Sequence, residues 1–394
     1  MPEQWKTKKA FLILTSILMA LTFSAWTVML NNFVVEKANF TGEEIGLLQS
    51  LREVPGFLAF TAVFLLLLLK EQTFALISLC LLSVGVAITG FFPYEIGLYA
   101  TTVLMSIGFH YFETINQSLS LQWLSKEEAP RVLGVILSIK SLVALIVYGL
   151  IWLFFSVFHI EFSTAYLFFG TVGFALFVWL WFSFPHFEAP VQQHKKLILR
   201  KRYWLFYALT FFSGARRQIF LVFAGFMMVE KFNYNAADIA LLFIINHLFN
   251  LYAAPKLGKL VGKIGEQKAL TIEYVGLMIV FVGYALVESA EMAAFLYVVD
   301  HLFFALAIAI KTFFQKIADP ADIASTASVS FTINHIAAVV IPAAFGLMWL
   351  VNPSYVFLSG ALMAFGSLLL AQFVDRELML NNAEGLVKEK GMVV

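Results

Sequence analysis

The sequence predicts an all-α polytopic membrane protein whose twelve transmembrane helices form two pseudo-symmetric six-helix bundles. Three observations lead to this fold class: an apolar composition, long apolar runs and an internal repeat. Hydrophobic residues make up 61% of the 394-residue chain and charged residues only 13%, whereas soluble proteins average about 45–50% and about 25%. The apolar runs approach the roughly 20 residues that a helix needs to cross a bilayer. Barrel strands would be shorter, about 10 residues, and alternating.

The internal repeat relates residues 36–48 to residues 230–242, at an offset of 194 residues. Its polar matches are Glu36-Lys37 with Glu230-Lys231, and Asn39 with Asn233. Matches between leucines mean little in an apolar chain, but matches between charged and amide residues do not follow from composition. Because the offset is close to half the chain length, the sequence indicates a duplicated six-helix unit.

The apolar runs define the elements in order, six on each side of a basic linker. The predicted spans are 10–31, 43–69, 73–92, 95–123, 130–156, 163–184, 203–229, 236–258, 268–287, 291–315, 322–350 and 354–375. We therefore expect an N-terminal bundle over 1–184, a linker over 185–202, and a C-terminal bundle with a short tail over 203–394. The run after Lys9 is too long for a cleavable signal core, and the single cysteine, Cys80, excludes a disulfide framework.

The distribution of Lys and Arg predicts the orientation of these spans. Nineteen of these residues fall in the termini, the linker and the loops on the same side, whereas only Lys37 and Lys231 fall in loops on the opposite side. Basic residues are retained on the cytoplasmic side of a membrane. We expect a multi-pass protein of the cytoplasmic (inner) membrane with both termini and the linker in the cytoplasm.

Charged residues inside the first six spans are the first candidates for function. The second span contains Arg52 and Glu53, followed by a predicted kink at Pro55, and the fifth contains Lys140. In the fourth span, a polar stripe occupies one helical face, because its members are spaced by four, three and four residues: Ser106, His110, Glu113 and Gln117. Such residues are costly in lipid and therefore face a bundle interior or a watery cavity.

The second half repeats the plan with different chemistry. Its candidate residues, on the seventh, eighth, tenth and eleventh spans, are Arg216, Arg217, Asn246, His247, Asp300, Lys311, Asn334 and His335. Arg216 and Arg217 are about 100° apart on a helix, so only one of them is expected to face a cavity, and the other to pair with Asp300 or a carbonyl. Asn334 occupies the position that Lys140 has in the first half. The third, sixth and twelfth spans have no such residues.

The chain resembles the major facilitator superfamily. The resemblance rests on two six-helix halves, a basic central linker, and the loop Gly258-Lys259-Leu260-Val261-Gly262-Lys263-Ile264-Gly265-Glu266-Gln267-Lys268. This loop fits the family pattern G-x-x-x-[DN]-[RK]-x-G-x-[RK]-[RK] at Gly258, Lys263, Gly265 and Lys268, with Gly262 in place of the acid. The first half has Leu68-Leu69-Lys70-Glu71-Gln72 where the motif should be. The resemblance implies a substrate site between the halves near the midplane.

These observations predict a secondary active transporter that moves a small organic anion by alternating access, coupled to protons. The predicted anion contacts are Arg52, Lys140 and one of Arg216 and Arg217, with Lys311 near the inner mouth and Asn246, His247, Asn334 and His335 as neutral contacts. Glu113 is the preferred proton carrier, followed by Glu53, Asp300 and His110. The expected partners are the solute, protons and the lipid bilayer, without nucleic acid or cofactor, and the protein is expected to be a monomer.

The same sequence features are compatible with other functions and with other roles for His110 and Glu113. A proton-driven multidrug or metabolite exporter would use its 43 phenylalanines to select apolar ligands, and a receptor or channel would not accumulate solute. His110 and Glu113 have the spacing of a helical metal pair, but Phe304 and Ala307 replace them in the repeat, so we expect no metal site. Glu113 could instead form a structural salt bridge with Lys140 or an arginine. The sequence contains no nucleophile, phosphate-loop or cofactor motif that indicates an enzyme.

Overall fold

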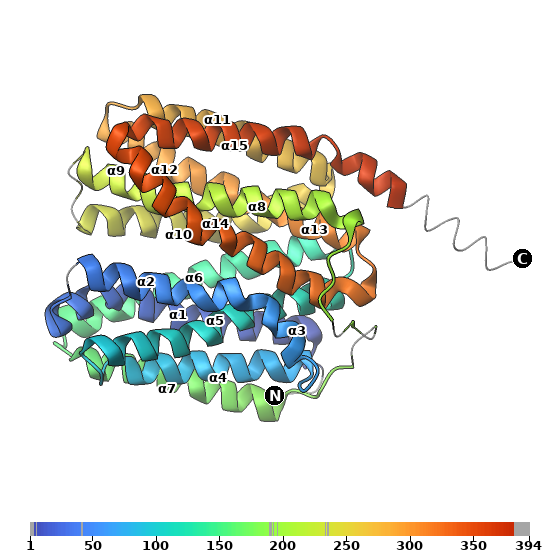
Figure 1. The fold of residues 1–394 in the computed structure, drawn as a ribbon. Coiled ribbons are helices and arrows are strands. Elements are labelled where there is room, and N and C mark those ends of the chain that lie inside the picture. Colours follow the sequence, from blue (N-terminus) through green and yellow to red (C-terminus); the bar gives the residue numbers. More distant parts are fainter. Residues whose placement is uncertain are drawn as a thin grey trace, which may run out of the picture. The chain divides into compact units, whose positions relative to one another are not determined.

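The structure is a computed structural model that describes residues 4, 6–40, 42–188, 191, 193, 194, 196–232, 234 and 236–381. Its described residues form helices and no strands (Figure 1). The first half comprises α1 (Lys8–Ala38), α2 (Gly42–Phe57), η2 (Leu58–Thr61), α3 (Ala62–Leu65), α4 (Glu71–Thr89), α5 (Glu95–Trp123), α6 (Ala129–Ser156) and α7 (Phe162–Ser183). The second half comprises η3 (Lys201–Tyr203), α8 (Trp204–Gln218), η4 (Ile219–Ala224), α9 (Gly225–Glu230), α10 (Ala236–Ile264), α11 (Glu266–Leu286), α12 (Ala290–Phe304), η5 (Ala305–Ala307), α13 (Ile308–Ile317), η6 (Pro320–Asp322), α14 (Ile323–Val351) and α15 (Pro353–Ala371).

Each predicted span coincides with one helix or with a chain of consecutive helices, and the all-α fold class is confirmed. The second span is broken where Pro55, inside α2, is followed by the 3-10 turn η2, as a proline kink requires. Within the described residues, eight helices are long and apolar enough to cross a membrane. The remaining spans are interrupted, as in α2 to α3 and α8 to α9, or carry polar residues, as in α5 and α10.

The chain divides into two compact units. Unit 1 comprises Met1–Leu124, Ile136–Ile198 and Ala321–Thr332, and unit 2 comprises Ser125–Val135, Leu199–Pro320 and Ile333–Val394. The beginning of α6 therefore belongs to unit 2, and the beginning of α14 belongs to unit 1. The domain boundaries expected from the linker, 1–184 and 203–394, stay a prediction.

In unit 1, α4 packs closely against α5 and α7 (Figure 1). Glycine permits both approaches, since a Cβ at Gly108 would lie 2.3 Å from the backbone nitrogen of Leu82, and one at Gly170 would lie 2.4 Å from Cα of Ala87. The buried Ser83 and Thr89 hydroxyls of α4 donate to carbonyls of their own helix, which satisfies them without a partner helix. Unit 1 thus holds its polar stripe on a tightly packed framework.

In unit 2, α11 packs against α15 and α12 (Figure 1). The glycines of the sequence motif have two structural roles here. A Cβ at Gly258 would lie 2.3 Å from the carbonyl oxygen of Pro130, so this glycine lets α10 approach the start of α6. Gly265 precedes α11 with φ of 85°, a left-handed conformation that favours glycine.

The repeated stretch encodes the end of the first helix in each half. Asn39 adopts the left-handed conformation that commonly ends a helix, and the Phe40 amide donates to the Val34 carbonyl over 3.0 Å. At the repeat positions the Tyr234 amide donates to the Met228 carbonyl, also over 3.0 Å. Asn233 lies outside the described residues. The duplication seen in the sequence is therefore preserved in local structure.

Candidate functional site

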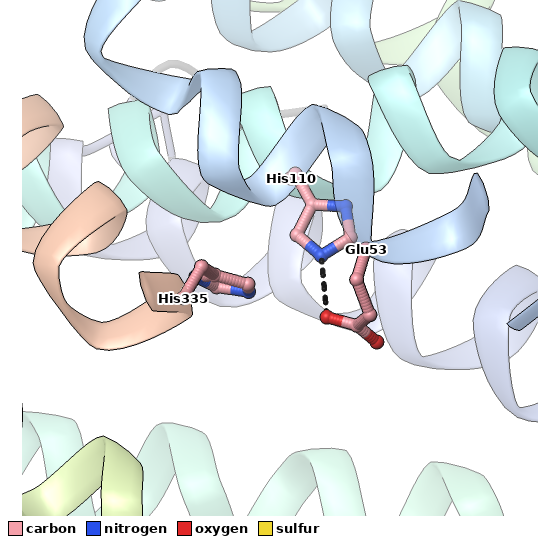
Figure 2. Close-up of side chains that lie close together, drawn as sticks. All are labelled: Glu53, His110 and His335. Atoms are coloured by element: carbon pink, nitrogen blue, oxygen red, sulfur yellow. Dashed lines mark ion pairs between the residues drawn. The ribbon is translucent and has the colours of Figure 1, made fainter. Parts of the chain in front are cut away.

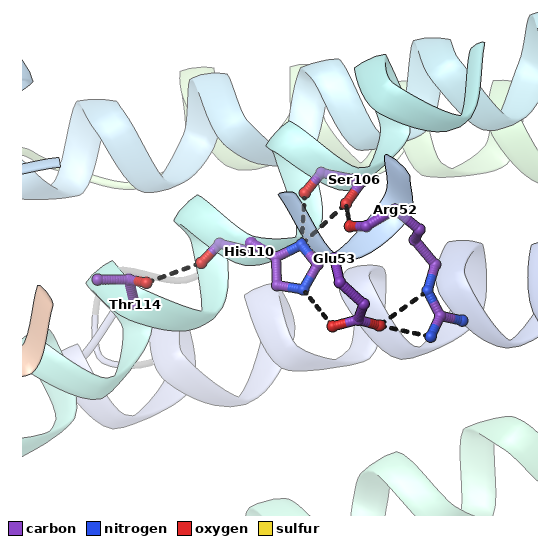
Figure 3. Close-up of polar contacts among 5 residues, drawn as sticks. All are labelled: Arg52, Glu53, Ser106, His110 and Thr114. Carbon is purple, nitrogen blue, oxygen red and sulfur yellow. Dashed lines mark hydrogen bonds and ion pairs between the residues drawn. The ribbon is translucent and has the colours of Figure 1, made fainter. Parts of the chain in front are cut away.

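The polar stripe of α5 meets α2 through an ordered network in unit 1. Glu53 accepts hydrogen bonds from Nε and Nη2 of Arg52 at 3.1 and 2.5 Å, both on Oε1. Its Oε2 lies 3.9 Å from Nε2 of His110, and Figure 2 shows the imidazole turned toward the carboxylate. The Ser106 hydroxyl donates to the Arg52 carbonyl, which fixes α5 against α2 (Figure 3). Arg52 and Glu53 are about a quarter exposed, whereas His110 is buried.

The network also determines the tautomer of His110. Its Nδ1 lies 3.0 Å from the Ser106 carbonyl oxygen and 2.9 Å from the Ser106 hydroxyl (Figure 3). A carbonyl oxygen can only accept, and the hydroxyl proton already points to the Arg52 carbonyl, so Nδ1 carries the hydrogen. When the ring is neutral, Nε2 of His110 is therefore an acceptor that faces the Glu53 carboxylate, which is also an acceptor. The contact between His110 and Glu53 becomes favourable when one proton lies on either of the two groups.

A second ion pair joins α5 to α6 in unit 1. Nζ of Lys140 lies 2.7 Å from Oε1 of Glu113, and the two side chains are 22% and 21% exposed. The pair is therefore neither fully solvated nor sealed in the core. His110 and Glu113 share a helical face, but they contact different partners, Glu53 and Lys140 respectively. The salt bridge left open by the sequence is present in the structure.

In unit 2, Arg216 enters a cluster of buried charge. Arg216, Glu273 and Asp300, from α8, α11 and α12, have no exposed surface. Nη2 of Arg216 lies 3.6 Å from Oε1 of Glu273, and Nη1 donates to the Ser367 hydroxyl of α15. The guanidinium also lies over the Tyr274 ring, 4.6 Å from its centroid. Arg216 is thus enclosed within its own unit.

Arg217 lies on a different side of α8 and is exposed. Electrostatic interactions link it and the half-buried His247 of α10 to His301 of α12. These three residues come from α8, α10 and α12 of unit 2.

The other predicted residues of unit 2 lie in varied surroundings. Asn246 of α10 is buried, and among the described residues neither its amide nitrogen nor its amide oxygen has a hydrogen-bond partner. Asn334 of α14 donates to the Thr210 carbonyl over 3.4 Å and packs on Gly214, where a Cβ would lie 2.5 Å from the Asn334 carbonyl. Lys311 is half-buried on α13, and His335 is buried on α14.

Two residues that belong to these clusters were not among the sequence candidates. Glu273 falls one turn inside the predicted ninth span, and His301 follows Asp300 directly. The signal for Glu273 was present, because an acid within a span is costly. Its role depends on contact with Arg216, which lies 57 residues away in the chain and is not specified by any local pattern.

Membrane-spanning helices in two units, each with charged groups among its helices, indicate a multi-pass membrane protein. The sequence profile of the Major Facilitator Superfamily matches residues 11–342. The chain belongs to the Major Facilitator Superfamily, as its resemblance indicated. Proteins of this family bind small-molecule solutes, and the family and fold indicate a transporter rather than an enzyme.

Solved structures of other proteins confirm the fold. Their sequence identities to this chain are too low to indicate which solute it carries. FucP, the fucose:proton symporter of E. coli, has a TM-score of 0.74 and 14% identity in its outward conformation, covering 93% of this chain and 98% of FucP. A bacterial homologue of the iron transporter ferroportin has a TM-score of 0.69 and 13% identity, covering 95% and 99%. The human organic anion transporter MFSD10 (TETRAN) has a TM-score of 0.69 and 12% identity, covering 97% and 100%. No curated protein sequence matches this chain significantly.

Proposed function

We propose that this secondary transporter carries a small organic anion together with a proton, and that the Lys140–Glu113 pair couples the two. The observation that carries the proposal is the 2.7 Å contact between Lys140 Nζ and Glu113 Oε1, with each side chain about one fifth exposed. A lysine retained inside a span is costly without a purpose. In this protein Lys140 is held by Glu113, a carboxylate that releases the lysine when it binds a proton.

Coupling follows from competition for the lysine. An anionic solute that binds Lys140 must displace the Glu113 carboxylate, whereas protonation of Glu113 removes that competitor. Proton and anion therefore each increase the affinity for the other, which is the reciprocity that linkage requires. A hydrogen bond to a charged group contributes about 1.5–3 kcal/mol, so the lysine accounts for roughly one to two orders of magnitude in solute affinity.

Other residues of the two units are proposed in supporting roles. In unit 1, Glu53 and His110 form a second place where a proton can be held, with Arg52 bonded to the same carboxylate. In unit 2, we propose Arg217 rather than Arg216 as the solute contact, because Arg217 is exposed and Arg216 is enclosed. Asn246, His247, Lys311, Asn334 and His335 remain proposed solute contacts, and Asp300 a proton carrier.

The fold neighbours are compatible with this chemistry. FucP is a fucose:proton symporter and MFSD10 is an organic anion transporter, so proton coupling and organic anion transport both occur on this fold. Neither activity is transferred by a fold similarity at such low identity.

The experiment is solute uptake by purified protein in liposomes with an imposed pH gradient. The probe is a mixture of carboxylates, phosphate esters, neutral sugars and apolar cations, read by mass spectrometry. We expect carboxylates or phosphate esters to accumulate with the gradient, and accumulation to stop when an ionophore collapses it. Selective movement of apolar cations would instead establish a drug exporter, and equilibration without accumulation would establish a channel; either result overturns the proposal.

Matched variants connect the activity to the pair. Glu113→Gln should abolish gradient-driven accumulation but retain solute exchange, because the neutral amide resembles the protonated acid. The control is Lys37→Asn, which removes a lysine from an exposed ion pair with Glu161 at 3.4 Å. This control should accumulate solute normally. Accumulation by Glu113→Gln at the wild-type level would exclude Glu113 as the proton carrier.

A further inference from the structure

The second span of unit 1 contains a short 3-10 turn, η2, between α2 and α3. Its residues are Leu-Ala-Phe-Thr, which include neither proline nor glycine. Pro55 explains a kink in α2, because its missing amide would otherwise bond to the carbonyl of Leu51. It does not explain why the residues after the kink adopt the 3-10 form. A 3-10 stretch in the middle of a helix often marks a functional hinge.

A side chain of α14 contacts this turn. The Thr332 hydroxyl donates to the Phe57 carbonyl over 3.0 Å and accepts from the Phe60 amide over 2.9 Å. These two backbone groups are three residues apart, which is the separation that a 3-10 hydrogen bond joins. An α-helix would instead direct the Phe60 amide to the carbonyl of Gly56, four residues before it. The hydroxyl therefore favours the 3-10 form of the turn over the α form.

The segments on both sides of η2 are attached to α5. Before the turn, the Ser106 hydroxyl donates to the Arg52 carbonyl. At its end, the hydroxyls of Thr61 and Tyr111 lie 2.6 Å apart and share a hydrogen bond. A change of η2 to the α form therefore has to break the contact between Thr61 and Tyr111, but it can leave Arg52 in place.

Thr332 lies where α14 passes from one unit to the other. Residues 321–332 belong to unit 1, and the helix continues in unit 2 from Ile333. In transporters built from two repeats, alternating access is largely a movement of one repeat against the other. A movement of α14 that withdraws Thr332 removes both of its hydrogen bonds to the turn. The position of α14 is thereby linked to the backbone form of the second span.

We propose that η2 is a conformational switch in unit 1, which Thr332 holds in the 3-10 form and which becomes α-helical when Thr332 withdraws. A 3-10 helix rises about 2.0 Å and turns about 120° per residue, whereas an α-helix rises about 1.5 Å and turns about 100°. Conversion of the four residues of η2 shortens the span by about 2 Å and turns α3 back by about 80°. Each residue of α3 then takes nearly the direction of the residue before it. The switch does not depend on the identity of the solute or on the coupling role of Glu113.

The switch can be tested by the mobility of a spin label on α3, measured by electron paramagnetic resonance on the full-length protein in lipid nanodiscs. In a Cys80→Ser background the label is placed at Phe64, which is 48% exposed, whereas Val63 before it is 1% exposed. The label should be mobile while Thr332 is in place. Thr332→Val removes the hydroxyl but keeps the shape, so the label should take the direction of Val63 and become immobilised. We expect the ratio of immobile to mobile label to rise about tenfold for the loss of two hydrogen bonds, which corresponds to about 1.4 kcal/mol.

Controls distinguish the switch from a general loss of packing. Thr332→Ser keeps the hydroxyl and should resemble the wild type. Thr89→Val makes the same exchange at a buried threonine whose hydroxyl donates to the Gly85 carbonyl of its own helix over 2.7 Å, and it should leave the label mobile. In Thr332→Val, a second label at Leu47, which is 48% exposed on α2 before the turn, should also stay mobile.

Each variant is checked for folding by thermal unfolding. If Thr332→Val does not fold, Thr332→Ala removes the same hydroxyl and gives the same decision. A Phe64 label that is equally mobile in Thr332→Val and in the wild type would overturn the proposal. Equal immobilisation of that label by Thr332→Ser or Thr89→Val, or of the Leu47 label by Thr332→Val, would overturn it as well.

Discussion

Replacing Glu113 with glutamine should strengthen solute binding while it abolishes coupling. In the wild type, an anion competes with the Glu113 carboxylate for Lys140 across a 2.7 Å contact. Exposed pairs contribute about 0–1 kcal/mol, whereas loss of one partner of a buried pair costs about 3–5 kcal/mol. The side chains are 21% and 22% exposed, so we assign the competition an energy between these limits, about 1–2 kcal/mol, which is a factor of roughly 5–30 in affinity.

The expected signature is a change in pH dependence rather than a uniform gain. The wild-type affinity should fall as the pH rises, because ionised Glu113 then occupies Lys140. In Glu113→Gln the affinity should be high and independent of pH, and it should equal that of the wild type in acid. The assay is equilibrium binding of the accumulated solute across a pH series, by isothermal titration calorimetry in detergent.

A double-mutant cycle with Glu113→Gln tests the role of Lys140 itself. Lys140→Asn, which copies Asn334 of the repeat, should weaken binding by one to two orders of magnitude, at about 1.4 kcal/mol per tenfold. The double variant with Glu113→Gln should bind as weakly as Lys140→Asn. If the double variant instead recovers the full wild-type affinity, Lys140 is only the counter-ion of Glu113 and the anion site must lie elsewhere.

Two further predictions concern orientation and packing. In a Cys80→Ser background, a cysteine at Lys196 should be inaccessible to an impermeant reagent added outside intact cells, because the basic linker is expected in the cytoplasm; labelling from outside would refute the orientation. Gly108→Ala should lower the thermal unfolding temperature, because its Cβ would lie 2.3 Å from the Leu82 nitrogen, whereas Gly149→Ala, with nothing within 4 Å, should be neutral or stabilising by up to about 1 kcal/mol. Equal unfolding temperatures for the two variants would contradict the close α4–α5 approach.

The helices were predictable because apolar runs and their polar boundaries are local signals. The predicted span 95–123 coincides with α5, and 163–184 differs by one residue at each end from α7 (Phe162–Ser183). The break after α2 had a local signal in Pro55. The π-helical segment η4 (Ile219–Ala224) had none, because the run continues with residues that suit an α-helix equally well.

The two compact units do not each follow one uninterrupted stretch of the chain. The linker and the repeat suggest two halves that follow each other along the chain. The structure assigns Ser125–Val135 to unit 2 and Ala321–Thr332 to unit 1. Within unit 1, Thr332 donates to the Phe57 carbonyl and accepts from the Phe60 amide, just where α2 is interrupted. Contacts of this kind depend on helix packing and leave no periodic pattern in the sequence.

The candidate site was predictable as a set of residues but only partly as a set of contacts. Helical spacing placed His110 and Glu113 on one face of α5. The free-energy cost of a charged group in lipid identified Arg216 and Asp300 as unusual. Spacing could not show that Glu113 contacts Lys140 while His110 contacts Glu53, since this depends on how α2 and α6 pack on α5. Sequence alone did not distinguish Arg216 from Arg217, whereas the contacts of Arg216 with Glu273 of α11 and Ser367 of α15 do.

Coupling through the Lys140–Glu113 pair can be measured as the number of protons taken up when solute binds. Purified protein in weakly buffered detergent solution, with a pH-sensitive dye, is mixed with the accumulated solute at a pH where the wild-type affinity is falling. We expect the wild type to take up a proton on binding, and Glu113→Gln, which still binds the solute, to take up none. Binding without proton uptake by the wild type, or equal uptake by Glu113→Gln, would contradict coupling through the Lys140–Glu113 pair.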